Sequence, residues 1–351
     1  MMIEKRIKMN LLFTSVGRRT YLIKYFRKAL GKEGKIFAAN SSALSPAFLE
    51  ADESVVTPTI YDKEYIPFLL KYCKKNSITA IISLFDIDVP VLSNHKKDFE
   101  KIGTRVLVSN SKFVEICNDK LKTYNFLMEN NFNAPLTLCS LERAKNYIKE
   151  GKIKYPLIVK PRWGMGSIGV FKADNEQELD VFYAKTKKEV EKTYLKYESQ
   201  QDISECVIIQ EMIDGQEYGL DVMNDLEGNY QNTCIKRKIA MRSGETDCSV
   251  TVDDEEIREI GERIAKKSNH IGNLDMDIFK TKAGKCYVLE MNARFGGGFP
   301  FSYLAGVDMP KAIIMWLKGE EVDRKILTPN IGVLGQKDIE LVRLPVELLK
   351  D

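Results

Sequence analysis

The N-terminal third of the chain alternates between strand and helix patterns, and this alternation restricts the fold more than any other feature. Buried, β-rich runs lie at residues 10–17, 35–40, 77–85 and 104–109, with helical stretches between them. Strands that alternate with helices form parallel βαβ units of a doubly wound sheet, with the functional loops at the carboxyl ends of the strands. The sequence therefore predicts an N-terminal α/β domain over residues 1–115.

The rest of the chain mixes strands and helices less regularly, as an α+β arrangement does. Residues 155–173 indicate a strand, a glycine-rich turn and a second strand, and residues 206–225 indicate two strands around a turn at 213–215. A length of 351 residues suits two or three domains. We predict a central subdomain at residues 116–205 and a C-terminal subdomain at 206–351.

Composition argues against several classes of protein. The net charge is only +3, which gives no case for a nucleic-acid partner, and no apolar run approaches the ~20 residues that cross a membrane. The N-terminus lacks the long apolar segment of a signal peptide, and seven cysteines without a C-x-x-C pair favour reduced thiols in a cytoplasm. With only two histidines, His95 and His270, a catalytic triad or a histidine zinc site has little basis. The chemistry is expected to rely on carboxylates, lysines and arginines.

Residues 276–299 combine an apolar strand pattern with acidic side chains. Two runs flank residues 283–284, which suit a two-residue hairpin turn. Counting outward from that turn places Asp277 opposite Glu290, and like charges that face each other across two strands are destabilising. A divalent cation would convert this repulsion into binding, and Asn292 on the same strand face adds a neutral oxygen. Two carboxylates and an amide suit Mg²⁺ or Mn²⁺, which retain waters and bind substrate phosphates.

The same acids would also be tolerated on the solvent-facing side of an ordinary hairpin, so the strand pattern alone leaves both interpretations open. The residues that follow favour a binding site. Arg294 supplies a cation, and glycines stand at positions 296–298. Backbone without side chains lets a ligand approach closely.

A lysine and a glycine-rich turn form a second candidate site. Lys160 ends an apolar run, where its charge must find an anion or a route to water. The backbone N–H groups of Gly164, Gly166, Ser167 and Gly169 can hold phosphate oxygens. The turn fits neither a Walker A loop nor a dinucleotide-binding motif. An ordinary glycine hairpin is the alternative.

A third candidate site follows the apolar strand that ends at Glu211. Met212 and Ile213 come next, as expected of a segment that lies against an adenine ring, and a carboxylate can accept a hydrogen bond from the exocyclic amine. Glu217 could bind ribose hydroxyls. Lys120, at the start of a predicted helix, is the weakest signal. The alternatives are an ordinary surface turn for the acids and a solvated first-turn lysine for Lys120.

Taken in order along the chain, these features resemble the ATP-grasp superfamily, and within it the group similar to one half of the carbamoyl-phosphate synthase large subunit. The resemblance covers nearly the whole chain and includes residues 13–26, which are typical of the preceding domain in that group. It implies an ATP-grasp fold: a doubly wound, parallel-sheet pre-ATP-grasp domain, a central lid and a C-terminal α+β subdomain. ATP and Mg²⁺ (or Mn²⁺) would bind between the last two.

The resemblance also implies a role for each matching residue. The ATP phosphates would be bound by Lys120 and Lys160, under a lid formed by Gly164, Gly166, Ser167 and Gly169. The adenine and ribose would be bound by Glu211, Met212, Ile213 and Glu217. The metal ions would be bound by Asp277, Glu290 and Asn292. The catalytic cations would be Arg294, Lys238 and Arg242, of which the last two could equally lie on a basic, exposed strand edge.

The reaction implied by the resemblance activates a carboxylate as an acyl-phosphate, which an amine attacks with release of ADP and phosphate. The expected partners are a small-molecule carboxylate and an amine, and a homodimer is compatible with the sequence. Asn40 and residues 84–88 depart from the pattern of the group where the first domain would face the substrate, so the acceptor stays open. The alternatives are phosphorylation of bicarbonate, as in carbamoyl-phosphate synthase, and a non-catalytic nucleotide-binding sensor.

Overall fold

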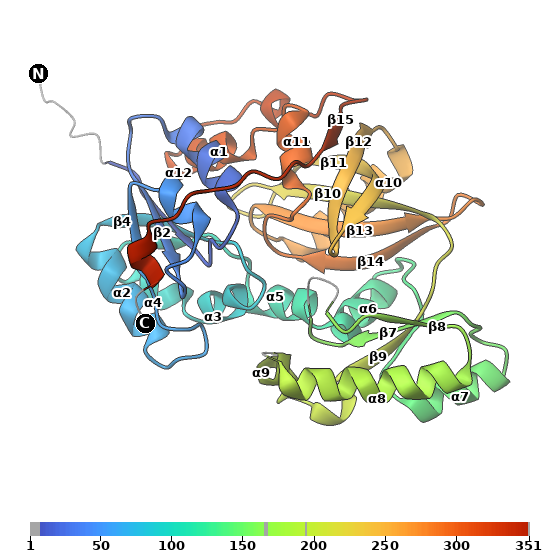
Figure 1. Ribbon diagram of the computed structural model, residues 1–351. Helices are drawn as coiled ribbons and strands as arrows, with labels where there is room; N and C mark the ends of the chain where they lie inside the picture. Colours follow the sequence, from blue (N-terminus) through green and yellow to red (C-terminus); the bar gives the residue numbers. More distant parts are fainter. Residues whose placement is uncertain (1–7, 165–167, 194, 350–351) are drawn as a thin grey trace, which may run out of the picture.

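The computed structural model describes residues 8–164, 168–193 and 195–349, whose strands form three sheets (Figure 1). The first sheet has five parallel strands in the order β3-β2-β1-β4-β5. Its strands are β1 (Asn10–Thr14), β2 (Ile36–Asn40), β3 (Glu53–Val56), β4 (Ile78–Ser83) and β5 (Arg105–Val106). Its helices are α1 (Thr20–Leu30), η1 (Pro46–Glu50), α2 (Tyr65–Lys75), α3 (Asp88–Asn94) and α4 (Lys96–Glu100). The doubly wound parallel sheet predicted from the sequence is confirmed.

Apolar patterning explains most of this first sheet. β1 is buried at four of its five positions, as parallel strands covered on both faces are. α1 turns Leu22, Ile23 and Phe26 inward and ends at Gly31, whose φ of +57° is left-handed. β3 was not predicted, because this edge strand is largely exposed and lacks an apolar signal.

The second, central sheet has four strands in the order β6-β9-β7-β8. Its strands are β6 (Thr137–Leu138), β7 (Leu157–Pro161), β8 (Phe171–Ala173) and β9 (Val207–Glu211). The helices of this part are α7 (Leu141–Lys149), α8 (Glu176–Lys192), α9 (Leu195–Ser199) and η2 (Ile203–Glu205). β7 and β8 pair antiparallel on either side of the glycine-rich segment, as predicted.

The third sheet has six strands in the order β14-β13-β10-β11-β12-β15. They are β10 (Gln216–Asn224), β11 (Tyr230–Arg242), β12 (Glu245–Val252), β13 (Asn273–Lys280), β14 (Cys286–Asn292) and β15 (Leu334–Gln336). The remaining helices are α5 (Ser111–Asn118), α6 (Lys120–Glu129), α10 (Glu255–Ser268), α11 (Phe299–Leu304), α12 (Met309–Leu317), η3 (Arg324–Leu327) and η4 (Val346–Leu349). None of the helices in the described ranges is both long enough and apolar enough to span a membrane.

The segment at residues 212–215 links two sheets. β9 pairs with β6 and β7 in the central sheet, whereas β10 pairs with β11 and β13 in the third sheet. The sequence predicted both strands correctly, but they do not form a hairpin with each other. The segment is therefore the hinge between the two sheets.

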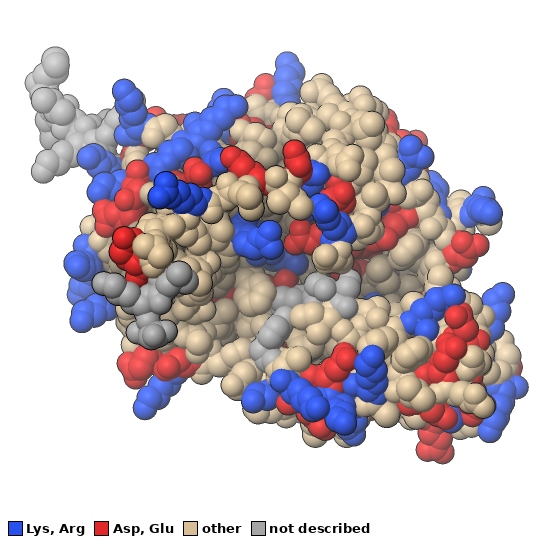
Figure 2. Space-filling view, in the orientation of Figure 1, with Lys and Arg blue, Asp and Glu red and all other residues tan. Residues whose placement is uncertain are grey.

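The hydrophobic cores divide the molecule into two parts of unequal size. The first and third sheets share cores: one contains Leu12 with Met276, and another contains Phe13 with Met223. The central sheet has a core of its own, around Val159. The central sheet and its helices thus form a separately packed unit opposite the other two sheets. A cleft between this unit and the rest of the molecule is visible in the space-filling view, with charged side chains at its rim (Figure 2).

Candidate functional site

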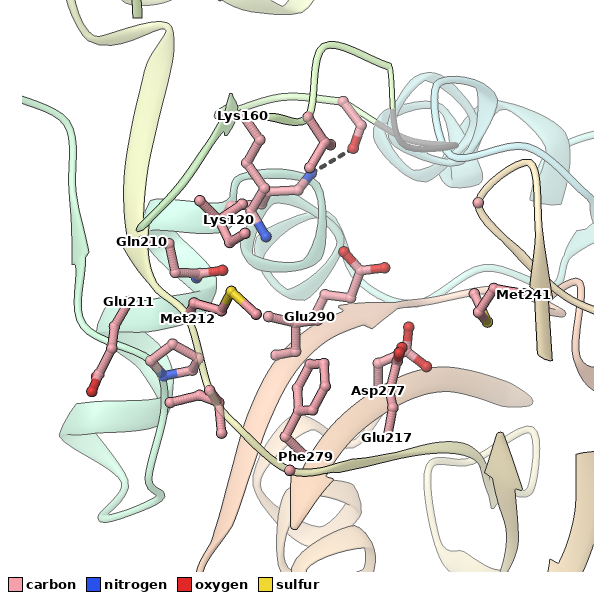
Figure 3. Close-up of a pocket in the computed structure, with 18 of the residues that line it drawn as sticks. Lys120, Lys160, Gln210, Glu211, Met212, Glu217, Met241, Asp277, Phe279 and Glu290 are labelled. Carbon is pink, nitrogen blue, oxygen red and sulfur yellow. Dashed lines mark hydrogen bonds between the residues drawn. The ribbon is translucent and has the colours of Figure 1, made fainter. Parts of the chain in front are cut away.

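A cavity of about 470 Å³ lies between the central sheet and the third sheet. One wall comes from β7 and the start of α6, and the opposite wall comes from β13 and β14 (Figure 3). The hinge at residues 212–215 closes one end, and the β11–β12 turn contributes Met241 and Gly244. A cavity of this size, at the junction of separately packed parts, is the usual setting of a small-molecule site.

Two lysines line the wall formed by β7 and α6. Lys160 lies at the end of β7 with only 7% of its surface exposed, and burial lowers its pKa to about 8. Lys120 begins α6, and its ammonium donates to the carbonyl of Gly164 (Figure 3). Lys120 also acts to lower the pKa of Lys160, so the two charges lie close together. Two neighbouring ammonium groups, one buried and one half-buried, favour a polyanion as ligand.

A buried ion pair holds Lys120 against β7. Asp119 caps α6 by accepting from the backbone N–H of Leu121 at 2.9 Å. The same carboxylate receives two hydrogen bonds from the Arg162 guanidinium, each 2.8 Å long. The backbone N–H of Lys120 donates to the carbonyl of Arg162 at 3.2 Å. The sequence did not indicate Arg162 as a partner of Asp119, because the two stand 43 residues apart.

The hinge end of the cavity is mainly apolar. Ile158, Phe279 and Leu289 line it together with the hinge itself. The Glu211 carboxylate is turned toward β6, where it accepts from the backbone N–H of Leu136 at 3.3 Å. The backbone N–H of Glu211 donates to the carbonyl of Leu136 at 2.9 Å, so a ligand at this end would meet the backbone of Met212 and Ile213. An apolar slot edged by backbone polar groups suits a flat heterocyclic base.

Asp277 and Glu290 stand opposite each other in the β13–β14 ladder, as predicted. The turn differs from the prediction. Thr281 and Lys285 close a three-residue loop in which Gly284 has φ +84°, so the pairs next to it are shifted by one residue. An irregularity after Asp277 restores the predicted register. The sequence therefore predicted the facing acids correctly, although it predicted the turn between their strands incorrectly.

The environments of the two acids differ. Burial raises the pKa of Asp277 to about 7, although Lys238 acts to lower it. Burial also acts to raise the pKa of Glu290, but Lys120, Lys160 and Lys238 outweigh it, and the pKa lies below its ordinary value. The ammonium of Lys238 lies 2.7 Å from an oxygen of Asp277 and 2.7 Å from an oxygen of Glu217. The negative charges of this wall are therefore balanced by lysines.

The side chains around Asp277 fit a hard divalent cation. The carboxylates of Asp277 and Glu290 face each other, and Asn292 lies two residues farther along β14 on the same face. Among the residues that the structure describes, no group of three or more His, Cys, Asp and Glu side chains is arranged to hold a metal. A metal here would need further ligands from water and from a phosphate, which is how Mg²⁺ commonly binds.

Arg294 anchors a second cavity, of about 260 Å³, which adjoins the first at Asp277 and Glu290. Its guanidinium lies 2.8 Å from Asp86, which follows β4 of the first sheet, and 2.9 Å from Asp275 of β13. The sequence did not indicate either acid as a partner. Asp86 stands near the carboxyl end of a parallel strand, which is a signal that could have found it. Asp275 carries no such signal.

The structure gathers most, but not all, of the predicted site residues. The residues that line one or both cavities are Lys120, Lys160, Gly164, Glu211, Met212, Ile213, Glu217, Lys238, Asp277, Glu290, Asn292 and Arg294. Gly169 lies beside them with φ +67°. Arg242 is exposed at the β11–β12 turn and lines neither cavity. Gly166 and Ser167 lie outside the described residues. The individual roles stay predictions.

Comparison with known families decides the affiliation. A family model of the ATP-grasp domain matches residues 117–298, just over half of the 351 residues. The chain belongs to the ATP-grasp family. A second model, the PylC-like N-terminal domain, matches residues 11–107, the region of the first sheet. Both the ATP-grasp fold and the resemblance inferred from the motifs are confirmed.

Curated ATP-grasp relatives are named carbamoyl phosphate synthase large chain. The protein from Caldanaerobacter subterraneus subsp. tengcongensis is 26% identical over 330 residues, which are 91% of this chain and 28% of the relative. A Thermoanaerobacter protein is 26% identical over 257 residues, which are 70% of this chain and 22% of the relative. The chain thus spans about a quarter of the length of these relatives.

Solved structures share the ATP-grasp fold. The biotin carboxylase domain of Hydrogenobacter thermophilus 2-oxoglutarate carboxylase, solved with MgADP and bicarbonate, has a TM-score of 0.72 at 19% identity and covers 92% of this chain and 72% of that one. The L-amino acid ligase from Bacillus licheniformis has a TM-score of 0.62 at 20% identity, with coverages of 92% and 74%. N5-carboxyaminoimidazole synthetase from Staphylococcus aureus has a TM-score of 0.67 at 19% identity, with coverages of 91% and 80%. These likenesses concern the fold.

Proposed function

We propose that this ATP-grasp protein is an ATP-dependent ligase that activates a carboxylate as an acyl-phosphate and transfers the acyl group to an amine. The proposal rests on one observation, which is that the two cavities meet at shared carboxylates. Asp277 and Glu290 line both cavities, and Arg294 lines the second. A nucleotide in the first cavity would direct its terminal phosphate toward an acid held in the second.

Each wall has a distinct task in this proposal. Lys120 and Lys160 neutralise the phosphates, and the apolar slot by Phe279 holds the base. Asp277, Glu290 and Asn292 would hold Mg²⁺, which when bound polarises the terminal phosphate. Transfer of a phosphoryl group depends mainly on positioning and charge neutralisation, so a wall of this kind is sufficient without a nucleophilic side chain.

Arg294 would stabilise the charge on the transferred phosphoryl group. An oxygen of the acid forms a bond to the terminal phosphorus as the bond to the ADP oxygen breaks. The amine nitrogen then attacks the carbonyl carbon, phosphate leaves with that oxygen, and the amine loses a proton. Asp86 and Asp275 hold the Arg294 guanidinium between the first and third sheets. This fixed position would allow it to act without rearrangement.

Hydroxylamine provides a direct test, because it replaces the amine and converts an acyl-phosphate into a hydroxamate. A panel of amino acids and small organic acids, each with MgATP and hydroxylamine, should contain an acid that gives hydroxamate and ADP in equal amounts. Arg294→Ala should lose both products. Arg143→Ala, which removes an exposed arginine on α7, should keep them. ADP formation without hydroxamate from every acid would contradict the ligase reaction.

The names of the curated relatives favour a second candidate, which is phosphorylation of bicarbonate. In that case bicarbonate alone should stimulate ADP release, and no organic acid should yield a hydroxamate. A sensor without catalytic activity would bind MgATP and form neither product. The same assay therefore separates the three functions.

A further inference from the structure

The side chain of Lys238, in β11, extends across the third sheet to Asp277 on the cavity wall that would hold the metal. Its side chain is 8% exposed, and its ammonium lies 2.7 Å from Glu217 of the adjacent strand β10 and 2.7 Å from Asp277 of β13, one strand farther. The ammonium is thus enclosed between two carboxylates, which stabilise its positive charge.

A glycine in β10 leaves room for this crossing. Gly219 pairs with Asp277 in the ladder between β10 and β13. A Cβ atom at Gly219 would lie 3.2 Å from Cε of Lys238 and 3.6 Å from an oxygen of Asp277. Any larger residue would therefore crowd the lysine where it approaches Asp277.

We propose that Lys238 is a built-in counter-ion that keeps Asp277 occupied until a nucleotide arrives, so that a divalent cation binds well only together with ATP. The inference rests on the proposed function, because it concerns the metal side of the same site. A cation that arrives alone at Asp277 meets an ammonium already bound there, and like charges at such distances repel strongly. The phosphates of a nucleotide offer the ammonium another partner and release Asp277.

The pairing of the acids on this wall supports this order of binding. Asp275, Asp277 and Glu290 all line the second cavity. Asp275 is paired with Arg294, and Asp277 is paired with Lys238. The same lysine also engages Glu217, beside the nucleotide cavity. Lys238 therefore links the occupancy of the nucleotide cavity to the charge of the metal wall.

Binding of Mn²⁺ without nucleotide tests the counter-ion directly, since free Mn²⁺ is measured by its electron paramagnetic resonance signal. Lys238→Met keeps the aliphatic stem and removes the charge, so Mn²⁺ should bind about tenfold more tightly than to the wild type. Lys238→Arg should remain close to the wild type. Lys280→Met removes a lysine from β13 that pairs with Asp254 and Glu256, and it should change Mn²⁺ affinity less than about twofold.

Two further variants locate the effect at Asp277. In the double variant Lys238→Met with Asp277→Asn, the gain in Mn²⁺ affinity should disappear. Gly219→Ala keeps the lysine charge but crowds its approach, and it should raise Mn²⁺ affinity in the same direction by about threefold. This variant keeps the test available if Lys238→Met does not fold, which circular dichroism would show.

The possible results are distinguishable. Equal Mn²⁺ affinity in the wild type, Lys238→Met and Gly219→Ala would overturn the counter-ion even if MgATP binds and reacts. A gain that persists in the double variant would overturn it as well. If the predicted Mn²⁺ shifts are found but the wild type neither binds MgATP nor forms ADP, the proposed function fails and the counter-ion at Asp277 stands.

Discussion

The carboxylate of Asp88 and the carboxylates of Asp277 and Glu290 are held in opposite ways. Asp88, at the start of α3, is fully buried and accepts hydrogen bonds from Thr14, Ser83 and Tyr65, with no ion pair among the described residues. Asp277 and Glu290 line two cavities and are balanced by lysines. A carboxylate whose hydrogen bonds come from neutral hydroxyls of the protein has no capacity left for a ligand. Carboxylates that are balanced by lysines at a cavity can exchange those lysines for a metal ion.

Asp88 lies where a doubly wound sheet commonly binds a ligand. β1 and β4 are neighbours at the point where the order of the first sheet reverses, and doubly wound sheets commonly bind ligands at that point. Here the hydroxyls of Thr14, at the end of β1, and Ser83, at the end of β4, both donate to Asp88. The usual ligand position of the first sheet is therefore filled by side chains of the protein itself. The loop that follows β4 instead provides Asp86, which holds Arg294.

The largest effect is expected at the ligand-binding carboxylates. Glu290→Gln removes charge from the metal wall and should lower turnover about a thousandfold, since a bound metal supplies several kcal/mol of transition-state stabilisation. The measurement is ADP release with the acid found in the hydroxylamine screen. Glu259→Gln, on the exposed face of α10, is the matched control and should keep full turnover. Turnover of Glu290→Gln close to the wild type would remove Glu290 from the metal site.

The opposite pattern is expected for Asp88. Asp88→Ala leaves buried hydroxyls without an acceptor and should lower the free energy of unfolding by about 4 kcal/mol. Urea unfolding measures this loss. The affinity of the folded variant for MgATP should change by less than about threefold, because Asp88 lines neither cavity. A stable variant with lost nucleotide affinity would reverse the roles assigned to the two carboxylate groups.

His270 is a buried titratable group that, like Asp88, has a structural role. His270 donates from Nε2 to the carbonyl of Val222 at 3.0 Å, and its Nδ1 lies 3.3 Å from the amide nitrogen of Asn224, which can only donate and therefore favours the neutral ring. Burial lowers its pKa to about 4. Because an unfolded histidine takes up a proton near pH 6.5, this contribution to stability is complete above about 6.5 and is lost as the pH falls toward 4.

The resulting pH dependence can be measured. The free energy of unfolding should be about 2 kcal/mol lower at pH 5 than at pH 7 from this group alone. Urea unfolding of the wild type and of His270→Gln at both pH values isolates it, because the carboxylates contribute equally to both proteins. The same pH dependence in the two proteins would show that His270 is not held neutral.

The smallest effect is expected at the base end of the cleft. There the base is expected to meet the backbone of Met212 and Ile213, because the Glu211 carboxylate is turned toward Leu136. GTP should bind about tenfold more weakly than ATP, since its oxygen replaces the donor that a backbone carbonyl would accept. Glu211→Gln should leave this preference intact. Calorimetry with both nucleotides checks it, and equal binding would contradict an adenine site.

The sequence predicted the features that depend on neighbouring residues. Periodicity was sufficient for the parallel sheet and the helices between its strands, and strand alternation placed Asn292 on the face of Glu290. It did not predict that β9 and β10 belong to different sheets, because a strand pattern does not name its partner. The hairpin turn was wrong because a three-residue loop and a two-residue loop share the same glycine signal.

The parts that were missed depend on distant residues. Arg294 meets Asp86 across 208 positions of sequence, and Lys238 reaches Asp277 two strands away. Neither contact leaves a local pattern. Arg294 and Lys238 were predicted as catalytic cations, and the structure adds that both are paired with acids. Whether a cation is free or paired is decided by tertiary packing, which spacing along the chain does not reveal.

The central claim is that the carboxylates facing the cavities bind a metal–nucleotide complex. Titration with MgATP by calorimetry, with and without a chelator, tests this claim most directly. Wild-type protein should bind one ATP per chain in the micromolar to millimolar range with Mg²⁺, and much more weakly when the metal is chelated. Glu290→Gln should lose this dependence on Mg²⁺, whereas Asp88→Ala, measured under conditions where it is folded, should keep it. Equal ATP affinity with and without Mg²⁺ in the wild type, or no binding at all, would contradict the assignment.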